Sequence, residues 1–221
     1  MRIYHLLPAE FAINNIALKC MKISRYDDLN DPFELMSGNL GDKDLRIALT
    51  LIKKEFQKEH GLLCFSKSWK NPVLWSHYAD KHRGIALGFD VDDLYLTYVK
   101  YSNKRLDIKF NDGKILDHVD HAFIDKLLCT KYKHWEYEEE LRLHVDMEKM
   151  KDENGIYFLD FESANIELKE VILGHSCELS IDKIRGLIDT NYKGVNVTKA
   201  RLAFQEFHVV TDQRFQMKKM G

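Results

Sequence analysis

Two carboxylates and a guanidinium alternate along one short stretch of the chain. Residues 135–142 run Trp-Glu-Tyr-Glu-Glu-Glu-Leu-Arg, and Leu-His-Val follows them. This alternation with apolar residues predicts a strand, in which residues two apart share a face. Glu138, Glu140 and Arg142 would then point to one side, and Glu139 and Leu141 to the other.

Such a set of charges has several chemical uses. Carboxylates that lie close together raise one another's pKa, and a nearby arginine lowers the pKa of both. The set could supply a base, an acceptor for a ribose hydroxyl, or a buried ion pair. It could equally form a solvated edge strand with ion pairs across to its neighbour, and the stretch alone leaves these alternatives open.

A second dense group of polar aromatic residues and histidines lies upstream. Trp75, His77 and Tyr78 follow the apolar strand that carries Cys64 and Ser66. The spacing predicts an amphipathic helix that docks Trp75 and Tyr78, with His77 on a different face. A Cys–His nucleophile would need a contact that the sequence does not show, so a small buried thiol is the default interpretation.

Two further polar segments have a structural and a functional interpretation. His5 lies beside Tyr4 in the first predicted strand, where a histidine is most often a hydrogen-bonded structural residue. The segment 30–34, Asn-Asp-Pro-Phe-Glu, is a turn signal whose two acids could also rim a pocket. We predict no metal site, because His77 and His82 are five residues apart, which is poor spacing for two ligands on one helix.

The composition narrows the class of protein. The 221 residues are 45% hydrophobic and carry a net charge of -2, which indicates no general attraction to nucleic acid or to anionic lipid. The four cysteines are widely spaced and form no CxxC pair, as is typical of a reduced setting. With no signal-peptide region and no membrane-length apolar run, we expect a cytoplasmic protein without a membrane partner.

Hydrophobic periodicity predicts a single α+β domain over residues 1–221, with a mostly antiparallel sheet flanked by several helices. Helices are expected at 9–19, 42–60, 73–82, 114–132 and 181–189. Besides the acidic strand, strands are expected at 2–7, 21–24, 62–66, 84–89, 95–101, 156–161, 166–173, 195–199 and 204–210. The chain has no GxSxG, P-loop or GxGxxG motif to support a hydrolase, nucleotidase or Rossmann assignment.

Short motifs spread over most of the chain resemble those of a bacterial family known as domain of unknown function 2971. They are Tyr4-His5, Asn30-Asp31-Pro32-Phe33-Glu34, Cys64-Phe65-Ser66, Leu74-Trp75-Ser76-His77-Tyr78-Ala79, His82 with Gly84, Gly88-Phe89-Asp90, Trp135 with Tyr137-Glu138, Glu140, Arg142 and Ile172-Leu173-Gly174. The chain departs from the family after His5, where an aromatic residue and a threonine are usual and Leu6-Leu7 stand here.

A more distant similarity is to ADP-ribosyltransferases, which order a strand with His or Arg, a strand with Ser and a strand with Glu-x-Glu. His5, Ser66 and Glu138-x-Glu140 follow that order. The similarity implies that Glu140 binds a ribose hydroxyl of NAD and stabilises the oxocarbenium-like state as nicotinamide leaves. Glu138 would orient the acceptor, and Tyr78 would stack on the nicotinamide.

The resulting hypothesis is one cleft in which Glu140 faces His5 and His77, with Tyr4, Ser66, Tyr78 and Arg142 supporting a bound nucleotide-like ligand. NAD is the expected substrate, the acceptor is unknown, and a role in toxin or phage-defence systems would suit the class. Two alternatives stay open: a non-catalytic module for ligand sensing or protein interaction, and a nucleotide-processing hydrolase with Glu140 as general base.

Overall fold

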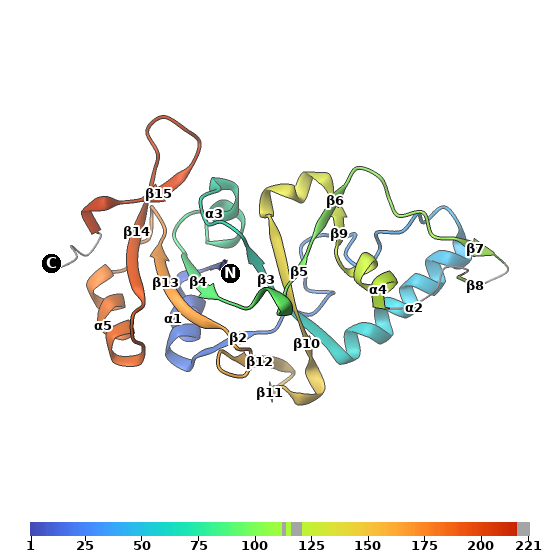
Figure 1. Cartoon of the computed structure of the whole chain (residues 1–221), viewed down its shortest axis with the longest axis horizontal. Coiled ribbons are helices and arrows are strands. Elements are labelled where there is room, and N and C mark those ends of the chain that lie inside the picture. The colour runs from blue at the N-terminus through green and yellow to red at the C-terminus, as the bar shows by residue number, and fades with distance from the viewer. Residues whose placement is uncertain (112–113, 116–120, 216–221) are drawn as a thin grey trace.

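An eight-stranded sheet runs through the middle of the protein (Figure 1). The computed structural model describes residues 1–111, 114–115 and 121–215. From one edge to the other the strands are β15 (Val209–Thr211), β14 (Asn196–Leu202), β13 (Glu167–Leu173), β4 (Ile85–Asp90), β1 (Arg2–Leu7), β3 (His60–Ser66), β10 (Glu140–Asp146) and β5 (Thr97–Tyr98). Neighbours are antiparallel except β13 and β14, which are parallel and are joined through helix α5 (Ile181–Asn191), as a parallel pair requires.

The two faces of this sheet are covered by different helices. Alternate strand residues such as Ile3 and Leu87 pack with α1 (Ala9–Leu18) and α5 in the largest apolar core. On α5, Ile181, Ile184 and Ile188 are buried at helical spacing. The opposite face carries the short helix α3 (Pro72–Tyr78), whose Leu74 and Trp75 pack with the intervening strand residues in a second core.

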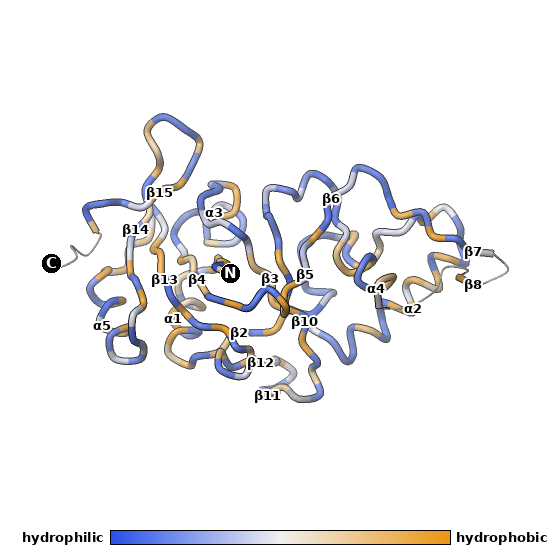
Figure 2. The backbone as a smooth tube through the Cα atoms, in the orientation of Figure 1, coloured by the Kyte–Doolittle hydropathy of each residue, from blue (hydrophilic) through white to orange (hydrophobic). Residues whose placement is uncertain are grey.

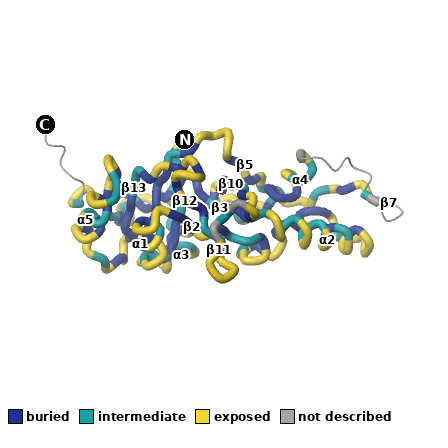
Figure 3. Tube along the Cα trace, turned by 90° about the horizontal axis from the view of Figure 1, so that it is seen from below, coloured by how far each residue is buried: buried dark blue, intermediate teal, exposed yellow. Residues whose placement is uncertain are grey.

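The remaining elements extend the molecule on both sides of the sheet. Helices α2 (Lys43–Glu59) and α4 (His121–Leu128) form one end with the parallel pair β6 (Lys100–Ser102) and β9 (Thr130–Tyr132) and the hairpin β7 (Phe110–Asn111) and β8 (Lys114–Ile115). Hydrophobic and hydrophilic residues alternate along α2 (Figure 2), which buries Leu45 and Leu49. A small sheet orders β11 (Lys151–Glu153), β12 (Ile156–Asp160) and β2 (Cys20–Lys22). Buried residues concentrate in the strands between α5 and α2 (Figure 3).

Strand β1 pairs very differently with its two neighbours. It forms six residue pairs with β4, from Arg2–Asp90 to Leu7–Ile85. With β3 it forms one pair, Tyr4–Ser66, although β3 itself pairs with β10 over seven residues. The two central strands therefore separate beyond Tyr4 and Ser66, and the sheet opens at this point.

The α+β class, the mostly antiparallel sheet and most of the expected elements are confirmed. The long helix expected at 114–132 is wrong: β8, α4 and β9 occupy its described part, and residues 116–120 lie outside the described residues. Pairing of β9 with β6 outweighs the helical spacing there. The expected strand 95–101 is interrupted, with a 3₁₀ turn at Asp93–Tyr95 before two short strands.

Two boundaries next to the polar groups were also wrong. Residues 133–138 form a 3₁₀ helix, and the acidic strand begins only at Glu140, because Glu139 takes a left-handed conformation with φ 43° that redirects the chain. Helix α3 ends at Tyr78, before three consecutive residues with positive φ: Asp80, Lys81 and His82. No helix in the described residues is both long and apolar enough to cross a membrane.

Candidate functional site

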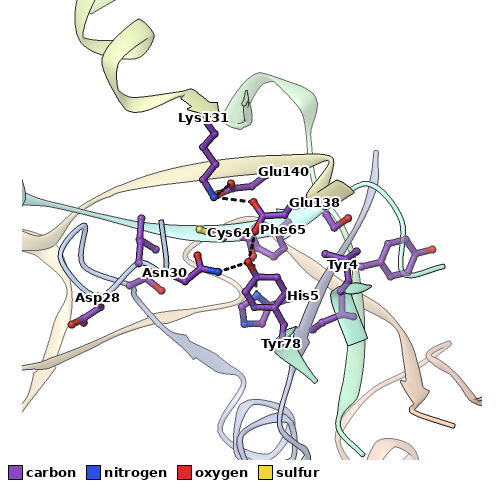
Figure 4. A pocket seen from close by; sticks show the side chains of 15 residues that line it. Tyr4, His5, Asp28, Asn30, Cys64, Phe65, Tyr78, Lys131, Glu138 and Glu140 are labelled. Atoms are coloured by element: carbon purple, nitrogen blue, oxygen red, sulfur yellow. Dashed lines mark hydrogen bonds and ion pairs between the residues drawn. The ribbon is translucent and has the colours of Figure 1, made fainter. Parts of the chain in front are cut away.

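A cavity of about 250 Å³ lies where β1 and β3 separate (Figure 4). Strands β1 and β3 form one side, Tyr78 of α3 borders it, and the segment after β2 contributes Asp28 and Asn30. Its lining residues are Tyr4, His5, Leu6, Ser24, Asp28, Leu29, Asn30, Cys64, Phe65, Ser66, Leu74, Tyr78, Lys131, Glu138 and Glu140.

His5 spans the gap between the separated strands. Its Nδ1 lies 2.8 Å from the carbonyl oxygen of Cys64. A carbonyl only accepts hydrogen bonds, so Nδ1 carries the proton and donates it, and Nε2 is left as an acceptor in the neutral ring. Burial lowers the pKa of His5. A side chain thus supplies a hydrogen bond where the backbone ladder between β1 and β3 is absent.

Tyr4, Ser66 and Glu140 form a row across three adjacent strands. The pairs Tyr4–Ser66 and Ser66–Glu140 lie directly opposite each other, so the three side chains share a face of the sheet. The hydroxyl of Tyr4 donates to Glu170 at 2.9 Å, and that of Ser66 donates to the carbonyl oxygen of Ser68 at 2.9 Å. Both hydroxyl groups therefore donate their protons to protein acceptors and not to a ligand in the cavity.

Glu140 is held in a buried ion-pair network behind the cavity. Arg142 is fully buried, and its Nε donates to Glu140 Oε1 at 2.8 Å while its Nη2 donates to Glu34 Oε2 at 3.0 Å. It also donates to the carbonyl oxygen of Leu128. Burial alone would raise the pKa of Glu140, but Arg142 and Lys131 together lower it to about 2. Glu140 is consequently an anion at any pH near neutrality.

Lys131 joins the two cavity carboxylates. Its Nζ lies 2.8 Å from Glu138 Oε2 and 2.6 Å from Glu140 Oε2, and all three side chains are at most 6% exposed. Burial opposes the charge on this lysine, yet Glu140 and Glu138 raise its pKa above the ordinary value. Lys131 is therefore a cation near neutral pH, and Figure 4 shows its side chain bonded to both carboxylates.

Glu138 is connected to the cavity mouth through Tyr78. The Tyr78 hydroxyl donates to Glu138 Oε1 and accepts a hydrogen bond from Asn30 Nδ2 at 2.7 Å. Burial raises the pKa of Glu138 more than Lys131 lowers it, and Glu140 adds to the increase. The pKa values of Glu138 and Glu140 are thus shifted in opposite directions although the two groups share one lysine, a pattern typical of acid–base assignments.

The structure brings together most of the residues singled out in the sequence. Those that line the cavity are Tyr4, His5, Ser66, Tyr78, Glu138 and Glu140. Arg142 lies behind Glu140 and does not line the cavity. His77 is exposed and its Nδ1 lies 3.2 Å from the Tyr137 hydroxyl, so the structure does not bring it to the cleft with Glu140. Helix α3 turns Tyr78 inward and His77 outward.

Two sequence hypotheses are corrected by this geometry, and the default interpretation of Cys64 is supported. Glu138 does not share a strand face with Glu140 and Arg142; it reaches the cavity from the 3₁₀ helix. The acids of the 30–34 segment do not rim the pocket: Asp31 is buried, accepting from the backbone N–H of Phe33, and Glu34 is buried against Arg142. Cys64 lines the cavity, but burial raises the pKa of its thiol, which disfavours a thiolate nucleophile.

Lys131 and Asn30 are the functional candidates that sequence reasoning missed. Lys131 precedes Tyr132, Lys133 and His134, which are all exposed, so nothing in the local pattern distinguishes a buried lysine. Asn30 was assigned only to a turn. Among the residues described, no group of three or more His, Cys, Asp or Glu side chains is placed to hold a metal ion.

Comparison with known proteins supports the family resemblance and adds no biochemistry. Residues 74–143, which include Tyr78, Lys131 and both cavity carboxylates, match the model of a family described as "Protein of unknown function (DUF2971)". No curated protein and no solved structure matches the chain.

Proposed function

We propose that the cavity binds the nicotinamide–ribose end of NAD and that the protein transfers ADP-ribose to an acceptor. The observation that carries the proposal is the pair Glu138 and Glu140, which border one cavity with their pKa values shifted in opposite directions. One permanently ionised carboxylate beside one that can exchange a proton suits a reaction in which positive charge develops and a proton is removed.

The size and charge of the cavity support this ligand class. Its volume of about 250 Å³ is just below the roughly 300 Å³ at which typical small-molecule sites begin, so it suits one ring and sugar better than a whole dinucleotide. Within the part of the chain that the structure describes, Glu34, Glu138 and Glu140 form ion pairs with two cations, Lys131 and Arg142. With all five ionised, this group has a net charge of -1, which favours the cationic pyridinium.

Each step can be assigned to a group at the cavity. The C1′–N bond breaks and its electron pair stays on nicotinamide, while Glu140 offsets the positive charge developing on the ribose. The acceptor then forms a bond to C1′, and its proton moves to Glu138. Lys131 acts as a positioning residue that holds both carboxylates, and Tyr78 offers a ring for stacking at the mouth.

The test is nicotinamide release from NAD, followed by chromatography, for the wild type and two variants. Glu140→Gln keeps the shape of the side chain but removes the charge, and we expect a loss of about 100-fold or more, as for other charge-stabilising groups. Glu138→Gln should lose about 100-fold by removing the base. Glu136→Gln is the matched control, since Glu136 is exposed and forms an ion pair with the exposed Lys133; it should behave as the wild type.

The same samples need a binding measurement, because Gln at a buried ion pair could also perturb folding. Wild type should show a rise in melting temperature with NAD, and both variants should be folded by circular dichroism. The proposal is overturned if no acceptor, water included, supports release and NAD does not shift the melting temperature. Release that survives Glu140→Gln removes the role of that residue.

One observation favours a second candidate, a non-catalytic ligand-binding module. Each carboxylate oxygen of Glu138 and Glu140 already has a partner in Lys131, Tyr78 or Arg142, as in a purely structural network. Such a module would show the NAD-dependent shift in melting temperature with no nicotinamide release. Release with water as the sole acceptor would instead identify a hydrolase.

A further inference from the structure

A second cavity of about 220 Å³ lies against the parallel pair β6 and β9 and has the opposite charge character to the first. Its lining residues are Phe33, Ser37, Ser102, Asn103, Lys104, Arg105, Thr130, Lys131 and Tyr132. None of these nine residues is acidic, whereas Asp28, Glu138 and Glu140 line the first cavity. The two cavities share Lys131, whose ammonium group is bound to the carboxylates of the first.

Arg105 is held in place without a carboxylate partner among the described residues. Its guanidinium lies 4.6 Å from the centre of the Phe33 ring. Its Nη1 donates to the carbonyl oxygens of Met36 at 2.8 Å and Gly38 at 3.1 Å. Nε and Nη2 therefore keep N–H groups for a ligand in a fixed orientation, the arrangement with which arginine binds phosphate.

The segment before Arg105 is also fixed. Ser102 Oγ donates to the carbonyl oxygen of Lys104 at 2.8 Å and accepts from the Lys104 N–H at 3.0 Å, which closes a tight turn. The turn holds two cationic residues in sequence on the cavity wall. Phe33 and Tyr132 are about half exposed and border the same space, so an aromatic base could pack there.

We propose that this second cavity binds the phosphate groups of a nucleoside diphosphate. The positive charge of Lys104 and Arg105, the anchored guanidinium and the absence of acidic lining in the described part of the chain favour an anion here. The volume fits a diphosphate or a sugar phosphate rather than a whole nucleotide, so the base would extend along Phe33 or Tyr132. The proposal does not depend on ADP-ribose transfer, because it concerns a different cavity and ligands without nicotinamide.

Titration calorimetry with ADP and with inorganic pyrophosphate tests the site. Both should bind, and the affinity should fall as salt is added. Lys104→Gln and Arg105→Gln should each weaken both probes about tenfold or more, as expected from the loss of a charge-assisted hydrogen bond. Lys104→Gln is the cleaner variant, because Lys104 is exposed and Arg105 also supports the chain at Met36 and Gly38.

Lys183→Gln is the matched control. It makes the same change in net charge on an exposed residue of α5, at the other end of the molecule (Figure 1), and should leave both affinities unchanged. ADP that binds at least tenfold more tightly than pyrophosphate would show that the nucleoside adds contacts; equal affinities would assign the binding to the phosphates alone. The proposal fails if neither probe binds, if Lys104→Gln and Lys183→Gln have equal effects, or if Glu138→Gln abolishes ADP binding while Lys104→Gln does not.

Discussion

Strand β1 is joined to β4 by a continuous ladder and to β3 by a single residue pair, and this difference locates the candidate site. On the β4 side, the alternate residues Ile3, Leu87 and Phe89 are fully buried in an apolar core. On the β3 side, the ladder is replaced by the His5 side chain, a cavity and a network of buried charges. Regular backbone pairing leaves no room for a ligand, so the site forms where pairing stops.

The two sides are also stabilised by different physical effects. The β4 side, called the apolar side below, depends on burial of apolar area and on dense packing. The β3 side, called the charged side below, depends on buried charges that are stable only while all their partners are present. The following experiments perturb the two sides separately and compare the effects on stability and on ligand binding.

The largest effect is expected from Arg142→Leu on the charged side. The substitution leaves Glu34 and Glu140 buried without their common partner, and breaking a buried ion pair in this way costs about 3–5 kcal/mol. Urea denaturation measures the free energy of unfolding. Arg83→Leu, which removes an exposed ion pair with Asp80, should have a much smaller effect, because solvent screens the pair. Equal losses for the two variants would mean that the network does not stabilise the fold.

Leu87→Ala tests the apolar side. Leu87 is fully buried between the ladders of β1 and β13, and truncating such a leucine costs about 2–5 kcal/mol. Ligand binding by the folded fraction should be unchanged, because Leu87 packs in the apolar core and does not line the cavity. Leu94→Ala, at an exposed position, should stay within about 0.5 kcal/mol of the wild type. A change in NAD affinity for folded Leu87→Ala would show that the two sides are coupled.

The charged side should also respond to pH. Burial and Arg142 lower the pKa of His144 from the ordinary 6.5 of a histidine to about 4, while its Nδ1 lies 2.9 Å from the Tyr26 hydroxyl. Between about pH 6.5 and pH 4, the unfolded state therefore binds more protons at His144 than the folded state does. The stability that neutral His144 contributes to the fold is fully present above about pH 6.5 and is lost as the pH falls toward 4. The full shift corresponds to about 3 kcal/mol.

The measurement is urea denaturation at pH 7 and at pH 5 for the wild type and His144→Gln. The wild type should lose more stability than the variant over this interval. The raised pKa of Glu138 acts in the opposite direction, so the difference between wild type and variant is the informative quantity. Identical pH dependence in both proteins would rule out His144 as the responding group.

The smallest effect is expected from His5→Leu at the boundary between the two sides. The substitution removes the hydrogen bond to the Cys64 carbonyl and should cost about 1–2 kcal/mol. Tyr4→Phe is the neighbouring control, since it removes the partly exposed bond to Glu170 and should cost less than about 1 kcal/mol. If His5→Leu is as stable as Tyr4→Phe, then His5 does not substitute for the missing ladder.

The sequence indicated much of the fold and part of the site, for physical reasons that differ. The segments β1, β4, α1 and α5 have clear periodicities because each buries one face or is wholly buried. The 3₁₀ helix before Glu140 was missed because the decisive feature is a left-handed Glu139, a conformation that side-chain alternation does not encode. The break in the helix expected at 114–132 depends on pairing with β6.

Within the site, the types of the residues helped to identify functional candidates, but their ion-pair partners could not be predicted from the sequence. Glu138, Glu140 and Tyr78 attracted attention because carboxylates and a tyrosine stood among apolar residues. Lys131 did not, because burial of a lysine is decided by carboxylates contributed from other elements. Glu34 was expected in a turn or at a pocket rim and not in an ion pair, since its partner Arg142 comes from a distant strand.

The bond between Glu34 and Arg142 joins residues 108 positions apart in the chain. A nascent chain leaves the ribosome N-terminus first, so Glu34 has no guanidinium partner until β10 has been synthesised, whereas β1 and β4 can pair much earlier. Contacts of such long sequence separation slow folding, because the closure of the intervening loop must precede the energy gained from the contact. The cavity, which needs Glu140 of β10, can therefore be completed only after the ladder between β1 and β4 has become possible. Release of a chain truncated before residue 142 would leave Glu34 without its guanidinium partner.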